Sequence, residues 1–121
     1  MRLLLGQASG WATLGLAVAA VALAYLFRDR LIAWHYTAGY AVAGLTVLHA
    51  WLSISPQAHS TAFTVGVWIA TGAMLLIFAQ VAVGLRLRQL GGDERVRQRR
   101  LHLQLMAVLA LAVVAHLVLN A

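Results

Sequence analysis

Long stretches without any formal charge constrain this chain more than any other feature. Residues 3–27 contain no Asp, Glu, Lys or Arg, and neither do residues 31–85. Only 10% of the 121 residues are charged, against about a quarter in typical soluble domains. A soluble fold of this size has much surface for its volume and needs more charge to cover it. The sequence therefore predicts an integral membrane protein, and excludes a soluble domain, a disordered tail and a nucleic-acid-binding module.

The apolar stretches divide into four predicted helices. One membrane crossing needs about 20 residues, so residues 31–85 are too long for a single helix. The polar segment 53–61, with Pro56 in it, divides them. Helices are expected at about 3–27, 31–52, 62–85 and 101–120, with charged connections at 28–30 and 86–100. We expect residues 1–121 to form one domain, an all-α integral membrane four-helix bundle with up-down-up-down topology.

The first stretch has one feature of a cleaved signal peptide. Ala22-Leu23-Ala24 fits a small-residue cleavage site. The apolar run is long for a signal peptide, however, and the stronger positive charge follows it rather than precedes it. We therefore expect a retained helix.

Arginine placement predicts the orientation in the membrane. Eight of the nine arginines lie in the connections 28–30 and 86–100. Because positive charge concentrates in cytoplasmic loops, these connections are expected in the cytoplasm of a bacterial inner-membrane protein. Both termini and the 53–61 loop are then expected in the periplasm.

Four of the five histidines fall inside predicted membrane helices, in two pairs with the same spacing. His35 and His49 are 14 residues apart in the second helix, and His102 and His116 are 14 apart in the fourth. At 100° and 1.5 Å per residue, such a pair lies within about 40° of one face and about 21 Å apart along the axis. Each pair therefore places one histidine near each edge of a hydrocarbon core about 30 Å thick.

Topology brings these histidines to matching depths. The second and fourth helices run in the same direction, so His35 and His102 are expected near the cytoplasmic edge, and His49 and His116 near the outer edge. Facing helices with one imidazole each are what a bis-histidine haem needs. The sequence predicts two non-covalent haem b groups between the second and fourth helices. A zinc site fits poorly, because this spacing holds the ligands too far apart.

Other residues are candidates for contacts with the haems. Gly39 and Gly66 lie on small-residue stripes that suit a flat macrocycle or ordinary helix packing. Arg28 and Arg100 flank the cytoplasmic haem position and suit its propionates, although the orientation signal explains most arginines. His59 in the outer loop is a candidate substrate-site residue that could pass a proton to a quinone or oxygen species. A solvated loop histidine is the alternative.

Glutamines and tryptophans complete the candidates. Gln80 and Gln104 are expected near the cytoplasmic edge, where a propionate, a ligand imidazole, a quinone or another helix are all open as partners. The four tryptophans, at positions 11, 34, 51 and 68, suit the aromatic belts at the two membrane interfaces.

The histidine pattern resembles a known family. The chain is similar to the cores of di-haem b-type membrane cytochromes, namely cytochrome b561, ferric-reductase-like domains and the four-helix core of cytochrome b in bc complexes. The matching segments are His35-Tyr-Thr-Ala-Gly39, Leu48-His49, Arg100-Leu-His102 and Ala115-His116. The resemblance implies transmembrane electron transfer and leaves the donor and acceptor open.

The chain also departs from each of these relatives. Bacterial cytochrome b561 usually draws one haem ligand from its first helix, where this chain has no histidine. The later helices and quinol-oxidation loop of bc-type cytochrome b have no counterpart in these residues, nor has the flavin domain of ferric reductases.

Several functions stay open at this point. The expected function is transmembrane electron transfer, as a quinone-linked oxidoreductase or with superoxide, ferric iron or a redox protein as partner, and with no residue acting as acid, base or nucleophile. The alternative is a haem-bearing or haem-free anchor subunit of a respiratory complex. Membrane lipid is an expected partner, nucleic acid is not, and a homo-oligomer is open. A small multidrug transporter needs a membrane-embedded carboxylate, whereas Asp29, Asp93 and Glu94 all fall in predicted loops.

Overall fold

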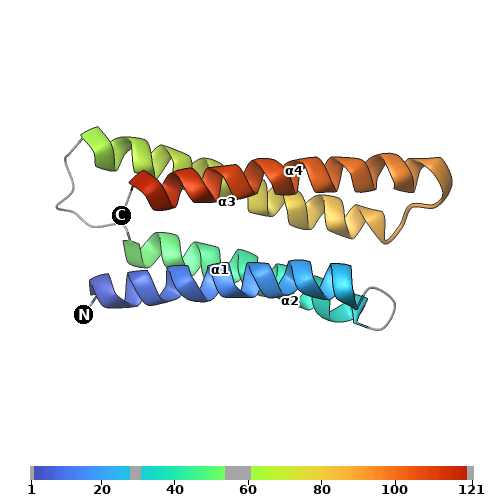
Figure 1. Ribbon diagram of the computed structural model, residues 1–121, viewed down its shortest axis with the longest axis horizontal. Coiled ribbons are helices and arrows are strands. Elements are labelled where there is room, and N and C mark those ends of the chain that lie inside the picture. Colours follow the sequence, from blue (N-terminus) through green and yellow to red (C-terminus); the bar gives the residue numbers. More distant parts are fainter. Residues whose placement is uncertain (1, 28–30, 54–60, 120–121) are drawn as a thin grey trace. The chain divides into compact units, whose positions relative to one another are not determined.

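The computed structural model describes residues 2–27, 31–53 and 61–119, and all regular secondary structure in these ranges is helical. The helices are α1 (Arg2–Leu26), α2 (Ile32–Ser53), α3 (Thr61–Leu87) and α4 (Gly92–Leu119) (Figure 1). The expectation of an all-α chain with four helices is confirmed. Three of them, α1, α3 and α4, are long and apolar enough to cross a membrane, which indicates a membrane protein. The uncharged α2 falls outside that set.

The chain divides into two compact units, 1–56 and 57–121, and each is a helical hairpin (Figure 1). In the first hairpin α1 and α2 are antiparallel, because Gly6 near the start of α1 contacts His49 near the end of α2. Ala20, towards the other end of α1, contacts His35. In the second hairpin α3 and α4 are joined by a four-residue turn and run antiparallel as well.

Small residues dominate the buried positions of the described helices. These positions are Gly6, Ala20, Ala38, Val42, Gly66, Ala73 and Ile77. Many large apolar side chains are exposed instead, such as Leu111 at 71% and Val118 at 72%. Exposed apolar surface on this scale suits contact with lipid. In lipid, helices associate through close backbone approach at small residues and through hydrogen bonds, and the hairpins show both.

Threonine hydroxyls are satisfied within their own helices. Thr13, Thr37, Thr46 and Thr71 each donate to the carbonyl four residues earlier, at 2.7 to 3.2 Å. Such back-bonding removes the cost of an unpaired hydroxyl in apolar surroundings.

The structure corrects the predicted connection at 86–100. The helix α3 continues to Leu87 and α4 begins at Gly92, whose φ of +54° ends the turn in a conformation that favours glycine. Asp93 and Glu94, predicted in a loop, occupy the first turn of α4, where the helix dipole stabilises negative charge. Arginine, glutamine and glutamate are good helix formers, so the charged residues before the apolar part of α4 are helical as well. The other described helix ends lie within two residues of those expected.

Candidate functional site

The helix α2 holds His35 and His49 against α1 in the same way. The His35 Nδ1 lies 2.8 Å from the carbonyl oxygen of Ala20, and the His49 Nδ1 lies 3.0 Å from that of Gly6. The two acceptors are 14 residues apart on α1, as the two histidines are on α2. Because both helices rise equally per residue, equal spacings bring the two histidines to equivalent positions on α1.

These contacts assign the imidazole protons. A carbonyl oxygen only accepts hydrogen bonds, so Nδ1 is the donor in both histidines. In a neutral imidazole, a proton on Nδ1 leaves the lone pair on Nε2. Metal-bound histidines typically show this arrangement, with the second ring nitrogen donating to a carbonyl or carboxylate. His35 and His49 therefore have the tautomer that ligation through Nε2 requires.

His49 is surrounded more closely than His35. Ser9 donates to the Gly6 carbonyl at 2.8 Å, and its Oγ lies 3.2 Å from the His49 Nδ1, while the Ser53 Oγ lies 3.4 Å away. A Cβ added to Gly10 would lie 2.9 Å from the His49 Cε1. The ring thus packs directly on the backbone of α1, at a position where glycine is needed.

In the second hairpin, His102 lies over α3 in a similar way. Gln80 donates from Nε2 to the main-chain carbonyl of His102 at 3.0 Å. A Cβ added to Gly84 would lie 3.7 Å from the His102 Cε1. Gln80 and Gly84 are four residues apart, as are the two glycines beneath His49. The imidazole of His102 therefore lies over Gly84, while Gln80, one helical turn earlier, binds the main chain of His102.

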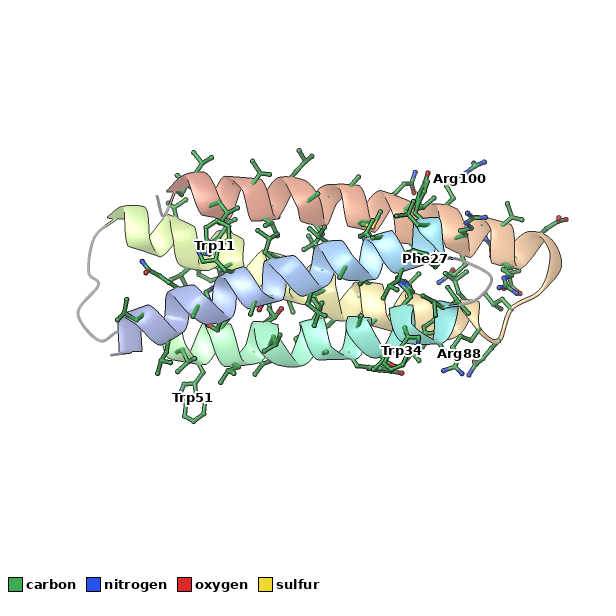
Figure 2. The ribbon with its side chains drawn as sticks, turned by 60° about the horizontal axis from the view of Figure 1, so that its bottom comes forward. Trp11, Phe27, Trp34, Trp51, Arg88 and Arg100 are labelled. Atoms are coloured by element: carbon green, nitrogen blue, oxygen red, sulfur yellow. The ribbon has the colours of Figure 1, made fainter. Side chains whose placement is uncertain are left out.

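The other predicted site residues are only partly covered by the described structure. Gly39 is half-buried, and a Cβ added to it would have no described atom within 4 Å. Gly66 is buried on α3. Arg100 is exposed on α4, two residues before His102 (Figure 2). Arg28 and His59 lie outside the described residues, so their roles stay predictions.

The four predicted ligands are divided equally between the hairpins, and all four are half-buried on helices. The pairings His35–His102 and His49–His116 join different hairpins and stay predictions. Within the described ranges, no group of three or more His, Cys, Asp or Glu side chains could hold a metal ion. A haem would need only two histidines, because its macrocycle supplies the other ligands of the iron.

The supporting role of α1 was not predicted from the sequence. It depends on Gly6, Ser9, Gly10 and Ala20, two of which act through main-chain carbonyls. Any residue type supplies a carbonyl, so these acceptors have no chemical signature. The 14-residue spacing of small residues on α1, which equals that of the histidines, was the available signal.

Comparison of the chain with protein-family models, curated proteins and solved structures finds no match. The resemblance to di-haem b-type cytochromes therefore remains an expectation that depends on the four histidines.

Proposed function

We propose that this chain is a di-haem b-type membrane cytochrome that transfers electrons from one face of the membrane to the other. The observation that carries the proposal is the pair of Nδ1–carbonyl contacts, 2.8 Å at His35 and 3.0 Å at His49. They give two histidines the same tautomer at positions 14 residues apart. This shared tautomer is the one that ligation through Nε2 requires.

Each haem would be held by one histidine from each hairpin, which requires the hairpins to associate in one four-helix bundle. His35 would pair with His102 near one membrane face, and His49 with His116 near the other. The protein holds a proton on Nδ1 of its α2 ligands and directs the Nε2 lone pair to the ligand position. A bound haem supplies one-electron chemistry between ferric and ferrous iron.

Neighbouring residues would accommodate the macrocycles. Gly39 lies one turn from His35 beside open space, so it offers room that a side chain would fill. Gly66 is a buried small residue on α3. Arg100 is exposed close to His102, and it and Arg28 have the planar geometry that suits a propionate.

Two tryptophans support α2 as a fourth membrane crossing. Trp34 is 63% exposed at the start of α2, and Trp51 is 75% exposed near its end and points away from α1 (Figure 2). They are 17 residues apart, which is about 26 Å along the helix. That separation is close to the thickness of the hydrocarbon core, about 30 Å, and tryptophan is enriched at both interfaces.

The orientation follows from the arginines. With four crossings, the connection 28–30 and the polar start of α4 lie on one side, and positive charge favours the cytoplasm for both. We therefore place the protein in a bacterial inner membrane, with both termini in the periplasm. The α4 arginines at positions 95, 97, 99 and 100 are all exposed.

Access to a haem edge at the protein surface, rather than the haem site itself, would decide which electron donor and acceptor react. A quinone, superoxide, ferric iron or a redox protein would each need only an approach to a haem edge, and His59 is the proposed proton carrier at the outer face. A haem-bearing or haem-free subunit of a larger respiratory complex is the second candidate. The described part of α4 favours it, since it contains no buried residue and offers a surface to another subunit or to a second copy of the chain.

A haem count on the purified protein tests the proposal. Pyridine haemochrome analysis should give two haem b per chain, and the reduced native protein should show the sharp visible bands of bis-histidine ligation. His35→Ala and His116→Ala should each lower the count, while Thr37→Val, an exposed polar position on α2, should not. A folded wild-type protein without haem would contradict the proposal and favour the haem-free subunit.

A further inference from the structure

Gln80 occupies the position on α3 that small residues occupy on α1. The imidazole of His49 contacts the carbonyl of Gly6 and packs against Gly10, one turn further on. The imidazole of His102 packs against Gly84, and the residue one turn earlier is Gln80. Gln80 therefore corresponds to the residues of α1 whose carbonyls accept the histidine proton.

The amide of Gln80 is already directed to His102. Its Nε2 donates to the His102 carbonyl at 3.0 Å, which fixes the plane of the amide beside this residue. Its Oε1 is buried and has no hydrogen-bond partner within the described part of the chain. A buried amide oxygen without a donor costs free energy, so a nearby N–H is expected to reach it.

We propose that the Oε1 of Gln80 accepts the Nδ1 proton of His102, so that one amide holds both the backbone and the ring of this residue. Gln80 is then a positioning residue, and its importance for a haem rests on the proposed function. It would give His102 the tautomer that Ala20 and Gly6 give the α2 histidines. The acceptor differs, because a helical carbonyl also accepts from the N–H four residues later, whereas Oε1 has no such competitor.

A stronger acceptor on Nδ1 increases the basicity of the ligand and favours ferric iron. Gln80 should therefore lower the midpoint potential of the haem that His102 binds.

Three variants of the full-length protein test this inference. Gln80→Leu removes the acceptor, Gln80→Glu keeps one, and Gln7→Leu is the matched control, since Gln7 is an exposed glutamine on α1. The first measurement is the ¹⁵N spectrum of histidine-labelled protein in lipid bilayers, with His102→Ala assigning the signal. The second is a redox titration of both haems.

Gln80→Leu should shift the His102 Nδ1 signal and raise the midpoint potential of one haem. An up to tenfold change in the equilibrium between its two oxidation states corresponds to about 59 mV for a one-electron couple. Gln80→Glu should give a potential at or below that of the wild type. Gln7→Leu should change neither measurement.

Equal upward shifts in Gln80→Leu and Gln80→Glu would show a packing role and overturn the inference, as would a Gln80→Leu spectrum identical to that of the wild type. A wild-type protein without haem would refute the proposed function instead. The ¹⁵N signal would still decide whether Gln80 binds the ring of His102.

Discussion

The contact between Gly10 and His49 yields a quantitative prediction. In Gly10→Ala the new methyl group would lie 2.9 Å from the His49 Cε1, whereas ordinary contacts are 3.4–4 Å. The ring or the helix must therefore move by about half an ångström or more to relieve the overlap. The ring cannot swing away freely, because its Nδ1 is bonded to the Gly6 carbonyl at 3.0 Å.

One stabilising and two destabilising contributions set the size of the change in unfolding free energy. Alanine in place of glycine within a helix stabilises by about 0.5–1 kcal/mol. Overpacking of this kind costs about 1–3 kcal/mol, and weakening one hydrogen bond adds roughly 0.5–1.5 kcal/mol. Gly15→Ala isolates the first term, because a Cβ there meets nothing within 4 Å in the described structure. Gly10→Ala should therefore be less stable than Gly15→Ala by about 1.5–4.5 kcal/mol.

The assay is reversible unfolding of both variants in the same detergent, together with the visible and EPR spectra of the purified proteins. Gly10→Ala should also perturb the spectrum of the haem proposed at the outer face, while Gly15→Ala should leave both spectra unchanged. Equal unfolding free energies with identical spectra would show that His49 does not pack on α1 at Gly10, and would refute the register of the first hairpin.

Three further predictions concern the outer face. His49→Ala should remove the proposed outer haem or make it high-spin and spare the cytoplasmic one, because the two ligand levels are about 21 Å apart. A haem count together with EPR checks this. Loss of both haems from a folded protein would refute the pairing. Ser9→Ala removes a hydrogen-bond donor to the Gly6 carbonyl and a neighbour of the His49 Nδ1. It should therefore lower the unfolding free energy by about 1 kcal/mol and change the midpoint potential of the proposed outer haem only. His59→Ala should keep both haem spectra and slow turnover with quinones in a pH-dependent way; unchanged turnover across roughly pH 5 to 9 would make His59 an ordinary loop residue.

The number of helices, and all their limits except the start of α4, followed from charge and from one proline. Uncharged stretches longer than one membrane crossing, divided at Pro56, located all four helices. The start of α4 was misplaced because absence of charge marks contact with lipid, whereas helix formation depends on backbone propensity. Residues such as Glu94 and Arg97 favour a helical backbone, but their charge keeps them out of lipid.

Only the histidines of the candidate site, and not their hydrogen-bond acceptors, could be predicted from the sequence. Histidine is rare inside membranes and carries its chemistry in its side chain, so the two 14-residue pairs were readily found. The acceptors on α1 could not be found in this way, because Gly6 and Ala20 act through the backbone. Finding them required the register of two antiparallel helices, which depends on packing along their whole length.

In the proposed arrangement the two hairpins support their histidines by different chemistry, and this difference would bear on function. Two haem sites with identical surroundings would have similar potentials and no built-in direction for an electron. In the first hairpin both acceptors are helical carbonyls, which are shared with the helix's own hydrogen bonds. In the second, Gln80 brings a side-chain amide to His102, at the level assigned to the cytoplasmic haem. A single glutamine in place of a small residue would then separate the two potentials and give the electron path a direction.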